Sequence, residues 1–161
     1  MDEDVYLIIA LFLQAADSLS LPGDVWADLS YSASLAGVSE TIEILRTEGR
    51  GDASGVALRL VSRRHGEAPR IQWANSQTCP VAADAVRNLR SIPMPDPVLP
   101  DDRGEIILDG VGYRVRFQAR YGLELGFPME LRSNTGTPLA AWVSRTFKML
   151  KPCWSTVRYA L

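Results

Sequence analysis

The chain has 161 residues, and we expect residues 1–161 to form a single globular domain large enough to bury a core. Its composition, 47% hydrophobic and 22% charged, is typical of a soluble globular protein and excludes a disordered chain. The formal net charge of -2 gives no reason to expect a nucleic-acid partner.

The charges are unevenly distributed along the chain. Residues 1–45 contain eight acidic residues and no Lys or Arg, whereas the remainder holds all 17 basic residues and 11 acidic ones. Either the two parts lie against each other and compensate, or the separation steers a charged partner.

The first element in the sequence is the apolar run VYLIIALFL, residues 5–13. A membrane span needs about 20 such residues, so we expect no span here. The length suits the apolar region of a signal peptide, but the preceding MDED is acidic where a signal is basic. We therefore expect residues 4–19 to form a buried helix or strand, and a signal segment over residues 5–16 is the alternative.

Alternation of apolar and polar residues dominates the rest of the chain and predicts strands. The expected strands cover residues 28–35, 39–47, 56–61, 70–73 and 123–131, together with a hairpin over residues 104–121. Asp109-Gly110 is typical of the type I′ turn of such a hairpin. Pro128 indicates an edge strand or a bulge.

Two helices are expected between and after these strands. Residues 80–92 show apolar residues at helical spacing, with Pro80 in the first turn and Thr78 or Cys79 as the cap. A proline-rich extended connection follows over residues 91–104. Residues 138–150 form the second helix, which Thr137 caps.

The only two cysteines lie just outside these helices, Cys79 before the first and Cys153 after the second. If the helices pack antiparallel on one face of the sheet, the two residues come within the 5.5–6 Å or so between Cα atoms that a disulfide requires. A disulfide implies an extracytoplasmic location, periplasmic or secreted, whereas two unpaired buried thiols would imply a cytoplasmic one.

The fold class that follows is α+β. We expect an antiparallel sheet of five to seven strands, two antiparallel helices on one face and the N-terminal apolar helix or strand.

An arginine-rich sheet face is the main candidate for binding. Arg114, Arg116 and Arg120 project from one side of a strand, and Arg59 and Arg63 share one side of another. If the two strands are neighbours, the five side chains form a basic patch that suits carboxylates and phosphates. The alternative is a solvated face on which arginines pair with Asp or Glu across strands.

The sequence contains few of the residues that commonly form metal sites or enzymatic sites. One His and two Cys fall short of a metal site, and we expect no metal and no cofactor. His65 and the acids of the proline-rich loop and hairpin are the only candidates for an enzymatic site; the loop and hairpin acids are Asp96, Asp101, Asp102, Glu105 and Asp109.

The leading functional hypothesis is a non-catalytic binding domain, such as an inhibitor or immunity-type accessory protein, with an acidic protein or a small molecule as its ligand. The alternatives are a hydrolase-like enzyme that uses the loop carboxylates and His65, and a structural module of a larger assembly.

Overall fold

The computed structural model describes residues 24–45, 55–97, 110–122 and 126–158. The expectations for residues 4–19, for the signal alternative over residues 5–16 and for the acids at positions 101–109 lie outside these residues.

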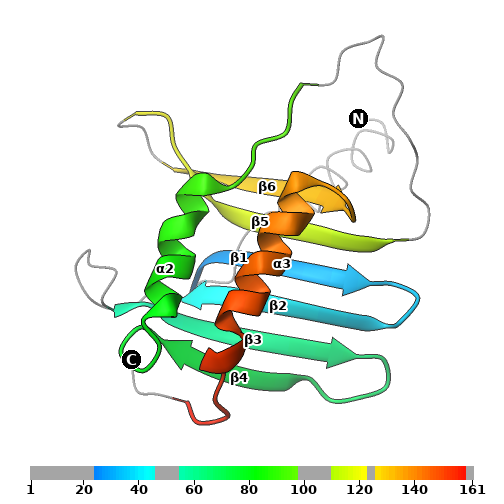
Figure 1. The fold of residues 1–161 in the computed structure, drawn as a ribbon, viewed down its shortest axis with the longest axis vertical. Coiled ribbons are helices and arrows are strands. Elements are labelled where there is room, and N and C mark those ends of the chain that lie inside the picture. Colours follow the sequence, from blue (N-terminus) through cyan, green and yellow to red (C-terminus); the bar gives the residue numbers. More distant parts are fainter. Residues whose placement is uncertain (1–23, 46–54, 98–109, 123–125, 159–161) are drawn as a thin grey trace, which may run out of the picture.

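A six-stranded antiparallel sheet forms one layer of the molecule, with the strand order β4-β3-β2-β1-β5-β6 (Figure 1). The strands are β1 (Val25–Ala33), β2 (Val38–Leu45), β3 (Ala57–Arg64), β4 (Arg70–Asn75), β5 (Val111–Ala119) and β6 (Phe127–Asn134). Strands β1 to β4 form a meander of successive neighbours, and β5 and β6 then extend the sheet on the other side of β1. The expected α+β class and strand number are confirmed.

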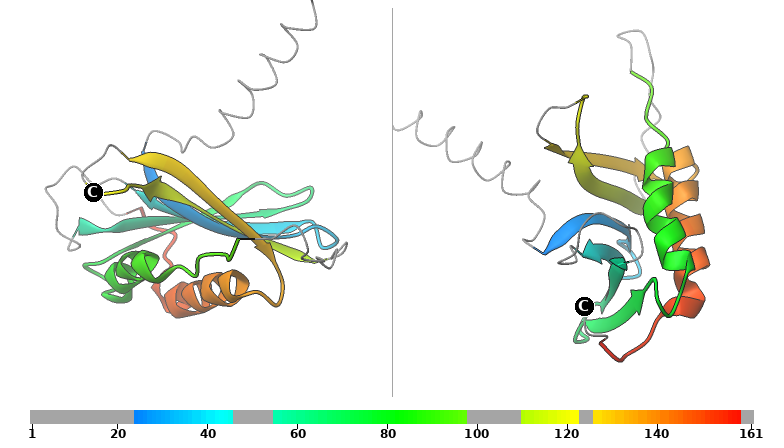
Figure 2. Two further views of the ribbon diagram at one scale, coloured as in Figure 1. Left: turned by 90° about the horizontal axis from the view of Figure 1, so that it is seen from above. Right: turned by 90° about the vertical axis from the view of Figure 1, so that its left-hand side faces the viewer.

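Within the described residues, the helices α2 (Val81–Arg87) and α3 (Pro138–Leu150) form the second layer and cover one face of the sheet (Figure 2). Helix α2 continues into the 3-10 turn η2 (Asn88–Ser91), and α3 continues into η3 (Lys151–Cys153). The two helices run antiparallel, as expected, because α2 starts near the end where α3 finishes (Figure 1).

The core lies between the two layers and is built by alternate strand residues. Leu29, Ile42, Leu58 and Val115 point to the helices and are almost fully buried, each at most 1% exposed. From α3, buried Leu139, Trp142, Val143 and Leu150 meet them. Because strand side chains alternate between faces, the residues between these apolar ones point away from the helices.

The helix caps differ from each other. Thr137 caps α3 as expected, since its Oγ1 accepts a hydrogen bond from the N–H of Ala140 at 3.1 Å. The expected side-chain cap of the first helix is wrong. Pro80 is the N-cap without a side-chain hydrogen bond, and Thr78 instead donates from its N–H and Oγ1 to Oδ1 of Asn75.

The hairpin expected over residues 104–121 is described only in its second strand. That strand exists as β5, and β1 and β6 are its two neighbours among the described strands. The first strand of the expected hairpin, residues 104–109, lies outside the described residues.

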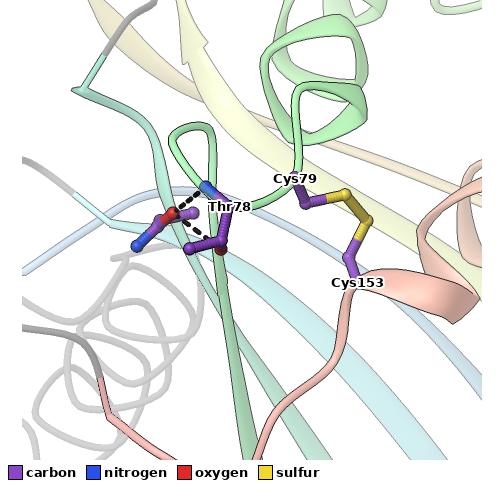
Figure 3. Close-up of a disulfide and its surroundings, with 4 residues drawn as sticks. Thr78, Cys79 and Cys153 are labelled. Atoms are coloured by element: carbon purple, nitrogen blue, oxygen red, sulfur yellow. Dashed lines mark hydrogen bonds between the residues drawn. A yellow bond between two sulfur atoms is a disulfide. The ribbon is translucent and has the colours of Figure 1, made fainter.

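The two cysteines meet at the shared end of the helices. Cys79 stands two residues before α2 and Cys153 ends η3, with their Cα atoms 5.6 Å apart and their sulfurs at disulfide distance (Figure 3). The pairing expected from the sequence is therefore present in the structure. Within the described ranges, no helix has the length and apolar character needed to cross a membrane.

Candidate binding surface on the uncovered sheet face

The described helices α2 and α3 lie on one side of the sheet (Figure 2). The opposite face carries the polar members of the alternating strands. We call it the open face. One row of side chains crosses five strands in register, and its members are Arg59, Glu43, Asp28, Arg116 and Glu130. Directly opposed charges across strands stabilise such a sheet.

Asp28 is the anchor of this row. It is only 1% exposed, and its Oδ2 accepts hydrogen bonds from Nε of Arg116 at 2.9 Å and from Nη2 of the same guanidinium. Two N–H groups of one guanidinium thus donate charge-assisted hydrogen bonds to a single carboxylate oxygen. Arg116 is thereby held by its neighbour, and it does not line the cavity described below.

Arg59 is held in a similar way. Its Nε donates to Glu43 across β2 and β3, and Nη1 lies 3.6 Å from Asp24. The guanidinium carbon also lies 5.8 Å from the ring centre of Trp73, within the range of a cation–π contact.

A hollow of about 600 Å³ lies beside this row on the open face. Arg63 of β3, Arg114 of β5 and Arg132 of β6 line it, with Gly112 in the same wall. The other lining residues are Ser30, Tyr31, Ser32, Ser39, Thr41, Tyr113, Ser133 and Asn134. None of the described lining residues is acidic, so the hollow combines three cations with hydroxyl and amide groups. We call this site the arginine hollow.

The register explains how distant segments build the hollow. Ser30 of β1 stands opposite Thr41 on one side and Arg114 on the other, and Arg114 stands opposite Arg132. Two residues further along the same strands, Gly112 stands opposite Ser32 and has no side chain. The missing side chain keeps the space between the arginines open.

Arg114 is the arginine with spare hydrogen-bonding capacity inside the fold. Its Nη2 lies 3.8 Å from Oδ1 of Asp28, beyond a hydrogen bond, and its Nε is buried with no hydrogen-bond partner among the described residues. A buried donor without a partner costs free energy, so an acceptor arriving in the hollow gains from satisfying it.

The structure places the five arginines expected to bind in different environments. Their strands β3 and β5 are not neighbours, because β2 and β1 lie between them, so the condition set for a basic patch of all five is not met. Arg59, Arg63, Arg114 and Arg116 nevertheless share the open face. Arg59 and Arg116 form the cross-strand pairs of the alternative interpretation, and Arg63 and Arg114 line the hollow. Arg120 follows the end of β5 and is exposed, outside the hollow.

Arg132 is a member of the hollow that the sequence analysis did not select. The expected strand ended at residue 131, whereas β6 continues to Asn134. The alternation of Leu131 with Arg132 is the signal that would have placed it on the open face. Its Nε donates to Glu130, and its side chain is 70% exposed.

The residues of the enzymatic alternative are not brought together in the part of the chain that the structure describes. His65 is exposed in the turn after β3, where its backbone N–H donates to the carbonyl of Gly37 at 2.8 Å. Asp96 is exposed in the segment after η2. The described residues contain no group of three or more His, Cys, Asp or Glu side chains that could hold a metal ion.

Comparison with protein-family models, with curated proteins and with solved structures finds no match to this chain.

Proposed function

We propose that this domain is a non-catalytic binding domain, of the inhibitor or immunity type, and that its arginine hollow holds an acidic segment of a protein partner. The observation that carries the proposal is the convergence of Arg63, Arg114 and Arg132 on a hollow without acidic lining residues. Guanidinium groups bind carboxylates through two parallel hydrogen bonds, which suits Asp and Glu side chains.

The neighbouring ion pairs support this assignment. Asp28 is engaged by Arg116 and Glu130 by Arg132, each through one carboxylate oxygen. Arg63 has no ion-pair partner among the described residues and is exposed at the rim. A partner's carboxylates would complete the charge balance of the open face.

A peptide is favoured over a single small anion because the arginines come from three different strands. One carboxylate engages one guanidinium fork, whereas linked carboxylates engage several at a high effective concentration. The paired cysteines lead us to propose further that the domain works in an oxidising, extracytoplasmic compartment.

The test is binding of a hexaglutamate peptide, measured by calorimetry at low ionic strength. A triple variant, Arg63→Gln with Arg114→Gln and Arg132→Gln, is expected to lose at least tenfold in affinity, since three charge-assisted contacts are removed. Free glutamate at the same carboxylate concentration is expected to bind far more weakly than the peptide.

A matched control separates the hollow from net charge. Arg90, Arg145 and Lys148 are exposed on the helical layer, and changing all three to Gln alters the net charge by the same amount. This variant is expected to keep the affinity of the unmodified protein. Equal losses in the two triple variants would show that peptide binding follows overall charge, and would overturn the proposal.

A further inference from the structure

A second cavity, of about 330 Å³, lies on the helix side of the sheet. Its lining joins residues of the sheet to Phe147 of α3 and Lys151 of η3. The C-terminal end of α3 lies over β3 and β4 (Figure 1). Its walls come from separate parts of the chain: Tyr31, Glu40, Leu60, Phe147, Lys151 and Trp154. The volume lies at the lower end of the range of small-molecule sites. The arginine hollow opens on the other face of the sheet, and Tyr31 belongs to the lining of both sites.

Aromatic side chains form most of the apolar wall. The rings of Tyr31 and Phe147 meet edge to face with their centres 5.1 Å apart, and Leu60 is buried beneath them. Trp154 packs partly buried against the same core. Edge-to-face packing of this kind holds the rings in fixed positions, so the wall is preformed for a flat or branched apolar group.

Glu40 supplies an acceptor in this wall. Its carboxylate accepts hydrogen bonds from the hydroxyl of Tyr31 and from Oγ of Ser62 at 3.2 Å. Burial, the hydrogen bond to Glu40 and its negative charge raise the pKa of Tyr31 to about 12, so the tyrosine remains a donor at neutral pH. An ionised carboxylate offers about four acceptor positions, which leaves capacity for a ligand donor.

Lys151 brings the opposite charge to the same cavity. It opens η3 at the end of α3, and it has no ion pair with Glu40 or with any other described residue. The cavity thus carries one anionic and one cationic side chain that do not neutralise each other in direct contact. The disulfide fixes the position of this corner, because Cys153 lies between Lys151 and Trp154.

We propose that this cavity is a binding site for a compact zwitterion with an apolar side chain, such as a free amino acid of the aromatic or branched class. Lys151 receives the carboxylate, Glu40 receives the ammonium group, and the rings of Tyr31, Phe147 and Trp154 receive the side chain. Two oppositely charged groups placed at one apolar wall select a ligand that carries both charges over one that carries either alone.

The experiment uses three probes that share a phenyl group: phenylalanine, 3-phenylpropionate without the ammonium group, and phenethylamine without the carboxylate. The readout is the NMR signal of the Trp154 indole N–H, assigned with Trp154→Phe. Phenylalanine is expected to shift the signal saturably, and the other two probes are expected to bind at least tenfold more weakly.

Variants then assign the two charges. Lys151→Gln and Glu40→Gln are each expected to weaken phenylalanine binding at least tenfold, and the amide of Glu40→Gln still accepts from Tyr31 and Ser62, so the wall is retained. Lys148→Gln, one turn earlier and outside the cavity, is expected to leave binding unchanged.

Two results would overturn the proposal. One is the absence of a saturable shift with phenylalanine or leucine at about 10 mM, where a ligand with a millimolar Kd binds measurably. The other is equal binding of all three phenyl probes, which would reveal an apolar contact without recognition of the two charges.

Discussion

Asp28 and Arg116 face each other across β1 and β5 and form a nearly buried ion pair on the side of the sheet that the helices leave uncovered. The carboxylate is 1% exposed and the arginine side chain 15%. This pair joins the β1–β4 meander to the β5–β6 pair and stands next to the arginine hollow, so it connects the stability of the sheet with the proposed site.

Asp28→Ala is expected to lower the free energy of unfolding by about 3 kcal/mol, because it removes a nearly buried carboxylate that accepts two hydrogen bonds from Arg116. Urea unfolding followed by circular dichroism measures the change. The matched control is Asp84→Ala, which removes an exposed ion pair with Arg87 on α2 and is expected to cost less than about 1 kcal/mol. Similar losses in the two variants would contradict the assigned role of Asp28.

Removal of the cysteine pair by Cys79→Ser with Cys153→Ser is expected to destabilise the domain by about 4 kcal/mol. The pair closes a loop with a sequence separation of 74 residues, and opening it restores chain entropy to the unfolded state. Urea midpoints with and without reductant measure the effect, and the serine variant should not respond to reductant. An unmodified protein that is equally stable in both conditions would contradict the pairing.

Stability is expected to fall as the pH rises from about 10 to about 12. The pKa of Tyr31 is about 12 in the folded state against 10.0 for a free tyrosine, so the unfolded chain loses this proton first. The contribution is fully present below pH 10 and is lost as the pH passes through the folded pKa. Comparison with Tyr31→Phe in alkaline urea unfolding isolates the effect, and parallel pH profiles for the two proteins would refute it.

Thr137→Ala is expected to cost about 1 kcal/mol, because the N–H of Ala140 loses its cap acceptor. Thr137→Ser keeps the hydroxyl and should retain most of the stability. Thermal unfolding of the two variants distinguishes the loss of the capping hydroxyl from the loss of the methyl group. Equal destabilisation by Ala and Ser would argue against capping.

The layer architecture and the cysteine pairing could be predicted from the sequence because the local signals for helix ends and for strand faces are consistent with each other. Pro80 and Pro152 mark opposite helix ends, and alternation in β3 and β5 correctly separates arginines from core residues. The pairing followed from the single assumption of antiparallel helices, which the structure confirms (Figure 1).

Strand order was not accessible because alternation reports which face a side chain occupies and not which strand lies beside it. Arg63 and Arg114 were placed on one face correctly, but two strands separate them. Leu35 was expected to continue the apolar side of the first strand, and it is instead 88% exposed in a turn closed by Gly37 at a φ of 58°. Gly37 can adopt this positive φ, so the chain turns there and the strand ends before the apolar alternation of its sequence ends.

The most direct test of the central claim is to fill the arginine hollow while keeping all three of its arginines. Gly112 has a negative φ, and a Cβ there would meet nothing closer than the carbonyl of Ser32 at 4.0 Å, so the backbone accepts a side chain at this position. We predict that Gly112→Leu folds with unchanged thermal stability and loses hexaglutamate binding by at least tenfold. Hexaglutamate binding as tight as that of the unmodified protein would contradict the account, because the arginines would then act without the hollow between them.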